Sequence, residues 1–298
     1  MEAPALGDVS RPAARASAPP TVPAPTRPAA RSRRGRPLSP GTAASLRAAS
    51  VVLFFAAWWG VSLLNAHVFK VFNPVLLPDP WVVLRAGIAM AATGELFQHI
   101  GASLARVVQG FLIAAVAGVL VGMAVGRSRV LEHLVDPSIE MLRPIPPLAF
   151  LPLMVLWFGI GEASKVAFIA YAAFFPIFTT TLEGIKYVDP LLVRAAASLG
   201  AGDRRVFWHV ILPAATPSII TGLRLGFGLS FFVIVAAEFI AADRGLGFLI
   251  NDARTFFLVA NMLLGAAVIG LIGFGVNVGL RRIESRLLRW RRESRGRA

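Results

Sequence analysis

The sequence of 298 residues contains no cysteine and only four histidines. Without cysteine the chain can form no disulfide, thiolate metal site or cysteine nucleophile. The histidines are scattered and none lies four residues from another, so no helical histidine metal site is expected. The glycine-rich loop that ends in Gly-Lys-Ser or Gly-Lys-Thr and holds nucleotide phosphates is also missing. We therefore expect this chain to bind no cofactor of its own.

Charged residues are scarce as well, at 15% of the sequence against roughly 25% in soluble domains. Hydrophobic residues make up 56%, and the mean hydropathy is +0.68. Because a helix needs about 20 apolar residues to cross a bilayer, the apolar stretches predict an all-α, polytopic membrane protein with six transmembrane helices. The predicted spans are residues 48–69, 105–125, 148–160, 165–182, 216–241 and 258–280. The third is short and begins among prolines, so its start is expected to be kinked.

The segments between these spans carry the polar residues. Residues 73–103 are predicted as an external loop with an amphipathic helix, because the stretch 81–98 is too polar to cross lipid. Residues 126–143 form a segment charged in both signs. A longer polar segment, residues 183–212, lies between the fourth and fifth spans.

Most of the net charge of +14 lies at the two ends, where residues 1–50 and 281–298 each hold eight arginines against two acidic residues. This placement argues against nucleic-acid binding, which needs a folded basic face. Residues 1–45 are mostly Ala, Pro, Arg and Ser and are predicted to be a disordered tail, followed by a transmembrane domain over 46–283 and a basic tail over 284–298. Six spans and the retention of Arg on the cytoplasmic side predict that both tails are cytoplasmic and near anionic lipid.

The most informative stretch is residues 190–214, on the predicted cytoplasmic side. Ala195–Leu199 favours a helix, and Gly200 favours its end or a sharp turn. Asp203 is a suitable N-cap for a second helix that reaches Val210, before Pro213. The stretch therefore predicts a short helix-turn-helix on the membrane surface.

This segment resembles the coupling loop of binding-protein-dependent ABC importer permeases, whose pattern is Glu-Ala-Ala, three residues, Gly, nine residues, Ile, one residue, Leu-Pro. Arg194 stands where the pattern has Glu, so the contacts of that Glu are not carried over. Val210 stands where the pattern has Ile. The resemblance implies that an ATPase is contacted by Arg194, Ala195, Ala196, Leu199, Gly200, Ala201, Leu212 and Pro213, with Val210 also at the pattern's spacing.

Three further stretches resemble the nitrate, sulfonate and taurine permease branch of this family: RPIPPLAFLPLMVLWFGIGEASK at 143–165, TGLRLGFGLS at 221–230 and AAEFIAADRGLGFLI at 236–250. The resemblance covers about residues 48–290. It implies a MetI-like, type I ABC importer transmembrane domain that works as a homodimer in the bacterial inner membrane. Its implied partners are two cytoplasmic ATPase subunits, which bind ATP and Mg, and an external solute-binding protein.

The resemblance is strongest to taurine permeases, in the WFGIGE turn, Arg194 and the RGLGF loop. It implies import of taurine by alternating access between inward-open and outward-open states. Permeation of other aliphatic sulfonates, nitrate or another small organic anion remains an alternative. A secondary transporter without an ATPase is an alternative of a different class, but it would have no use for the coupling loop. A membrane-embedded enzyme would need paired catalytic residues at one depth, which the sequence does not offer.

The fifth predicted span holds Arg224 and Glu238, and ionisable residues inside a span indicate function by default. A helix places them on one face but about 21 Å apart, so they cannot pair. One interpretation puts Arg224, Ser230 and Glu238 along the substrate pathway. In the other, Arg224 ties helices together and Glu238 caps the following loop. Asp243 and Arg244 in that loop fit either a docking site for the binding protein or a plain solvated turn.

Overall fold

The structure is a computed structural model that describes residues 39–71 and 73–287. The chain divides into two compact units, residues 1–53 and 54–298. The described part of the first unit contributes the start of helix α1 (Pro40–Leu64), and the elements discussed below belong to the second. Residues 40–45 of the predicted tail are therefore helical, and α11 includes residues 284–287 of the second predicted tail. The rest of both tail predictions lies outside the described residues.

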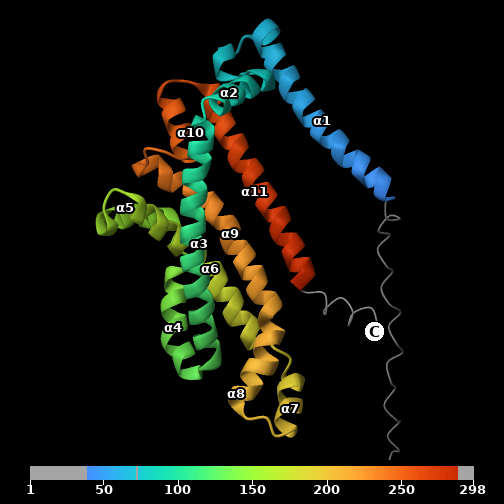
Figure 1. The fold of residues 1–298 in the computed structure, drawn as a ribbon, viewed down its shortest axis with the longest axis vertical. Coiled ribbons are helices and arrows are strands. Elements are labelled where there is room, and N and C mark those ends of the chain that lie inside the picture. Colours follow the sequence, from blue (N-terminus) through green and yellow to red (C-terminus); the bar gives the residue numbers. More distant parts are fainter. Residues whose placement is uncertain (1–38, 72, 288–298) are drawn as a thin grey trace, which may run out of the picture. The chain divides into compact units, whose positions relative to one another are not determined.

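All regular structure in the described residues is helical, in agreement with the all-α prediction (Figure 1). After α1 come a π-helical turn (Asn65–Phe69), a 3-10 turn (Pro74–Leu76), α2 (Pro80–Ala92), α3 (Glu95–Arg127), α4 (Arg129–Leu142), α5 (Pro147–Phe158), α6 (Glu162–Lys186), α7 (Pro190–Ser198), α8 (Asp203–Val206), a second π-helical turn (Phe207–Ile211), α9 (Leu212–Ala241), α10 (Leu246–Thr255) and α11 (Val259–Leu287).

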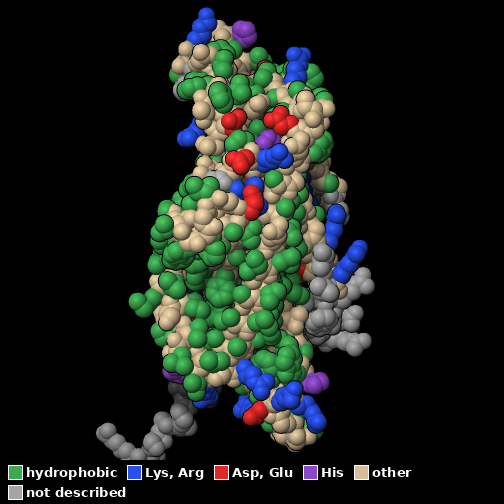
Figure 2. Space-filling view, turned by 60° about the vertical axis from the view of Figure 1, so that its left-hand side comes forward, with side chains coloured by type: hydrophobic (Ala, Val, Ile, Leu, Met, Phe, Trp, Pro, Cys, Tyr) green, Lys and Arg blue, Asp and Glu red, His purple; other side chains and the backbone are tan. Residues whose placement is uncertain are grey.

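Five segments of the described residues are long and apolar enough to cross a membrane, and α4 with α5 forms a sixth if the bent pair is counted as one span. The bend between α4 and α5 is 100°, which agrees with the predicted kink at the prolines. The charged segment 126–143 is largely the helix α4. On the face shown in Figure 2, a broad hydrophobic area lies between two groups of charged side chains, as expected of a membrane protein.

The predicted start of the second span at residue 105 is wrong, because α3 begins ten residues earlier, at Glu95. The polar residues of its first turns are hidden inside the protein instead of facing lipid: His99, Ser103 and Arg106 are all buried. The helix predicted within residues 73–103 is α2, which ends at Ala92, and the residues from Glu95 onward belong to α3. Asp79 caps α2 by accepting hydrogen bonds from the amides of Trp81 and Val82.

The centre of the second unit is α6, which packs between α3 and α9. Ile177 of α6 is fully buried and is flanked by a glycine on each side, Gly118 of α3 and Gly226 of α9. A Cβ at Gly118 would lie 2.9 Å from the Ile177 Cγ2, and one at Gly226 would lie 2.6 Å from its Cδ1. Because glycine has no side chain, the three helices can approach closely at these positions, as they do at small residues between membrane helices.

We predict that Gly226→Ala destabilises the protein, because the new methyl group must push against Ile177 and the backbone oxygen of Ala173. Overpacking of this kind costs about 1–3 kcal/mol. The apparent melting temperature in detergent measures the effect. Gly228→Ala, two residues along the same helix, is the matched control because its Cβ would meet nothing within 4 Å. Equal melting temperatures for the two variants would contradict the packing described.

Candidate functional site

The α7–α8 segment, residues 189–211, has the predicted helix-turn-helix form. The Asp189 side chain caps α7 by accepting a hydrogen bond of 2.8 Å from the Leu191 amide. After α7 the amide of Ala201 donates to the Ala196 carbonyl, and Gly200 adopts a φ of +79°. This left-handed conformation closes the helix and suits glycine, as expected from the sequence.

The second arm of the segment differs from the prediction in two ways. Asp203 is not the N-cap, because Gly202 occupies that position and Asp203 is the first residue of α8. The helix also does not end at Val210. It continues through the π-helical turn Phe207–Ile211 into α9, so that Asp203–Ile240 is one candidate span of 38 residues.

The proline at position 213 does not stop this helix because a wider turn precedes it. The amide of Leu212 donates to the carbonyl of Phe207, five residues back, instead of four. Pro213 directly follows this wider turn, at the point where the backbone hydrogen bonds change from five-residue to four-residue spacing. A π-helical turn of this kind often marks a functional position.

One face of the segment is anchored to the rest of the protein. Phe207 and Ala215 are buried together with Ile185 near the end of α6. The guanidinium of Arg127, at the end of α3, lies 5.1 Å from the centre of the Phe207 ring. Movement of α8 is therefore tied to α3 and α6 as well as to α9.

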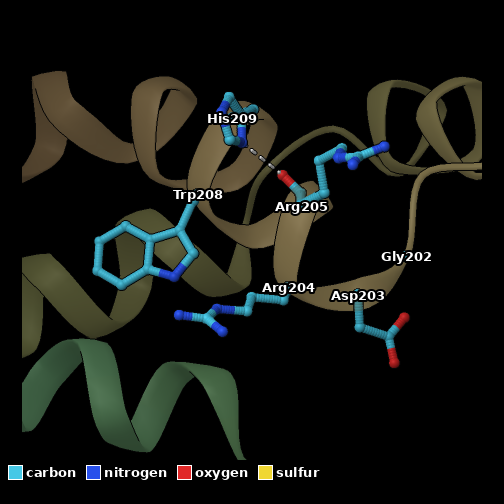
Figure 3. Close-up of a pocket in the computed structure, with 6 residues that line it drawn as sticks. All are labelled: Gly202, Asp203, Arg204, Arg205, Trp208 and His209. Carbon is cyan, nitrogen blue, oxygen red and sulfur yellow. Dashed lines mark hydrogen bonds between the residues drawn. The ribbon is translucent and has the colours of Figure 1, made fainter.

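The other face is exposed and carries both apolar and basic side chains. Leu199 is 89% exposed and Trp208 49%. An open depression of about 770 Å³ is lined by residues 202–205 with Trp208 and His209. Figure 3 shows Arg204 and Arg205 extending in opposite directions, while His209 contacts the Arg205 carbonyl at 3.2 Å. Of the predicted contact residues, Arg194, Ala195, Gly200 and Pro213 are also exposed, whereas Ala196, Ala201 and Leu212 are half-buried.

A second polar site lies where α3 meets the turn between α9 and α10. We call it the α3–α10 ion network, and it consists of His99, Ser103, Arg106, Glu162, Lys165 and Glu238. The Arg106 guanidinium reaches both acidic residues: Nη1 lies 2.6 Å from Glu238, and Nε and Nη2 lie 2.5 and 2.7 Å from Glu162. Lys165 also contacts Glu162, at 3.1 Å.

Glu238 is fully buried, so its charge has to be compensated from within the protein. Besides Arg106, it accepts hydrogen bonds from the Ser103 hydroxyl at 2.8 and 2.9 Å and from the Gly247 amide at 2.8 Å. Arg106 is not among the site residues that the sequence predicts. The available signal was the spacing of His99, Ser103 and Arg106, which places three polar side chains on one helical face.

The three residues predicted along a pathway lie in different surroundings. Glu238 belongs to the network, and the Ser230 hydroxyl donates to the Gly226 carbonyl of its own helix. Arg224 forms an ion pair of 2.5 Å with Glu284 of α11. It also lines an open groove of about 770 Å³ with Phe227, Gly228, Asn277 and Arg281, among others.

We predict that Glu238→Ala destabilises the protein by about 3–5 kcal/mol, because it removes one partner of a buried ion pair. The apparent melting temperature in detergent should fall by roughly 10 °C. Glu140→Ala is the control, since Glu140 is exposed on α4 and its loss should change stability by at most about 0.5 kcal/mol. A Glu238 variant as stable as the control would show that the Arg106–Glu238 pair contributes nothing to stability.

Comparison with known proteins places this architecture in a class. Residues 110–291 match the family described as "Binding-protein-dependent transport system inner membrane component". The match covers more than half of the chain, so the chain belongs to this family of ABC transporter permease subunits. It is a non-catalytic membrane protein of a system in which a separate ATPase hydrolyses ATP and a binding protein takes part.

Individual relatives narrow the class. The chain is 43% identical over 262 residues to the "Taurine transport system permease protein TauC" of Escherichia coli (strain K12), covering 86% of this chain and 93% of that protein. It is 37% identical to the "Putative aliphatic sulfonates transport permease protein SsuC" of Bacillus subtilis (strain 168), covering 76% and 82%. The "Nitrate import permease protein NrtB" of Synechocystis is 37% identical, covering 59% and 64%.

Solved structures confirm the MetI-like fold. An inward-facing structure of the MetNI methionine ABC transporter has a TM-score of 0.56 at 16% identity, covering 64% of this chain and 95% of that chain. An amino acid ABC transporter with histidines has a TM-score of 0.55 at 19% identity, covering 67% and 96%.

Proposed function

We propose that this chain is the membrane permease of an ATP-driven taurine importer that works by alternating access. The observation that carries the proposal is its 43% identity to a taurine permease over 86% of the chain. The relatives named for aliphatic sulfonates and nitrate are similar over less of the chain and represent the alternative substrates. In all three cases the solute is a small anion or zwitterion.

The proposed ATPase contact is the α7–α8 segment. Its exposed Leu199 and Trp208 offer apolar contacts, and Arg204 and Arg205 offer positive charge. Because α8 continues into α9, a displacement of the segment by the ATPase would move a spanning helix directly. ATP and Mg are bound by that partner. The basic termini are proposed to lie on the same, cytoplasmic side.

A homodimer is the proposed assembly, and the exposed face of α9 supports it. Leu225, Phe232 and Phe239 recur every seven residues and are all exposed. A seven-residue repeat keeps apolar side chains on one seam of a helix, which suits contact with another helix.

The proposed docking residues for the external binding protein are Asp243 and Arg244. They follow the C-terminal end of α9, whereas the α7–α8 segment precedes its N-terminal end.

The substrate is tested with the complex of this chain, its ATPase and its binding protein, reconstituted in lipid. We predict that taurine stimulates ATP hydrolysis, because solute-loaded binding protein favours one state of the permease pair. Longer alkanesulfonates and nitrate are the comparison solutes. Stimulation by one of these and not by taurine would replace the proposed substrate, and failure to assemble with an ATPase would overturn the importer function.

We predict that Gly200→Ala weakens the coupling of hydrolysis to transport, because a non-glycine residue in the left-handed conformation costs about 1–2 kcal/mol. The α7–α8 turn would then shift. Transport of labelled taurine per ATP hydrolysed measures the effect. Gly202→Ala is the matched control, since Gly202 has a φ of −70° and open space around its Cβ. Equal coupling in the two variants would remove the turn from the mechanism.

A further inference from the structure

The turn between α9 and α10, taken together with the first two residues of α10, is held by side chains at four consecutive residues, 244–247. The Arg244 carbonyl accepts a hydrogen bond of 2.6 Å from Arg106. The next three amides donate in sequence: Gly245 to His99 at 3.0 Å, Leu246 to Ser103 at 2.8 Å and Gly247 to Glu238 at 2.8 Å. The backbone of this turn is therefore fixed by side chains of other elements.

Three of these four side chains come from one face of α3. Residues 99, 103 and 106 are spaced by four and three, which aligns their side chains along a helix. The turn also requires its glycine, because Gly245 has a φ of +132° and a Cβ there would overlap the Glu238 carboxylate. The turn thus has one shape, determined by α3 and Glu238.

Arg106 has a second set of contacts that leads away from the turn. Its Nε and Nη2 bind Glu162, the first residue of α6. The other end of α6 is Lys186, three residues before the Asp189 cap of α7. A single well-buried helix therefore connects Arg106 with the α7–α8 segment, over about 37 Å.

We propose that the turn between α9 and α10, which carries the proposed docking residues Asp243 and Arg244, is held in place by four positioning residues: His99, Ser103, Arg106 and Glu238. Glu162 couples docking at this turn to α6. This inference rests on the proposed importer function. A turn held in its bound shape lowers the cost of docking, since little freedom is lost on binding. The Arg106–Glu162 pair connects that turn to the helix that reaches the ATPase contact, and a continuous packed helix is one element that can carry coupling between distant sites.

Two variants separate the two roles. Ser103→Ala removes the acceptor of the Leu246 amide and a donor to Glu238, and Ser103 is buried, so it acts on docking without contacting the binding protein itself. Glu162→Gln weakens the contact with Arg106 but leaves the turn's own hydrogen bonds in place. Glu140→Gln is the matched control, an exposed carboxylate of α4.

The measurement is ATP hydrolysis by the reconstituted complex over a range of concentrations of solute-loaded binding protein. Ser103→Ala should raise the half-saturating concentration about tenfold and leave the maximum unchanged, as expected from the loss of a hydrogen bond to a charged network. Glu162→Gln should lower the maximal stimulation several-fold at an unchanged half-saturating concentration. Glu140→Gln should change neither value.

The inference is overturned if Ser103→Ala leaves the half-saturating concentration unchanged, or if Glu162→Gln raises it. The latter result would mean that Glu162, which is 62% exposed, contacts the binding protein directly. Hydrogen exchange of the amides of residues 245–247 in the same complex gives a readout independent of transport. Faster exchange in Ser103→Ala than in wild type supports the positioning role, and equal exchange overturns it. A wild-type complex that binding protein fails to stimulate would instead contradict the proposed function.

Discussion

Charge compensation in an apolar environment is the constraint on which much of this structure depends. A carboxylate or guanidinium inside a membrane-embedded bundle has no water to stabilise it, so it needs a partner of opposite charge and complete hydrogen bonding. The structure meets this requirement with ion pairs between helices. Glu238 pairs with Arg106, and Arg224 pairs with Glu284. Each pair joins different helices, so the same contacts that make the charges tolerable also hold the bundle together.

The packing of α3, α6 and α9 follows a complementary rule. Lipid chains are as apolar as leucine, so burial of apolar surface alone gives these helices little reason to associate. Close backbone approach at Gly118 and Gly226 against Ile177 supplies dispersion contacts instead. The two kinds of contact alternate along α9: Arg224 lies two residues before Gly226, near the middle of the helix, and Glu238 lies near its C-terminal end. Close packing at glycine and ion pairs between helices therefore both hold the bundle together.

The sequence predicts those features that depend on local spacing. The helix-turn-helix around Gly200 and the kink ahead of α5 agree with the structure, because proline and glycine act on the residues next to them. The Arg106–Glu238 pair was not predicted, since its partners are 132 residues apart and no local pattern connects them. The sequence does not predict the early start of α3 for the same reason. Its first polar residues are typical of a loop, and the partners that bury them are distant in the sequence. The continuity of α8 with α9 depends on a single π-helical turn, which no residue pattern in the sequence predicts.

That continuity has a mechanical consequence. A helical segment from Asp203 to Ile240 has 38 residues and a length of about 57 Å, almost twice the roughly 30 Å of a bilayer's hydrocarbon core. Such a segment can act as a lever whose fulcrum lies in the membrane. A tilt of about 5° would shift each of its ends by roughly 2.5 Å in opposite directions. Gating would then need no change of helix length or register, and small rotations of one continuous helical arm would be enough.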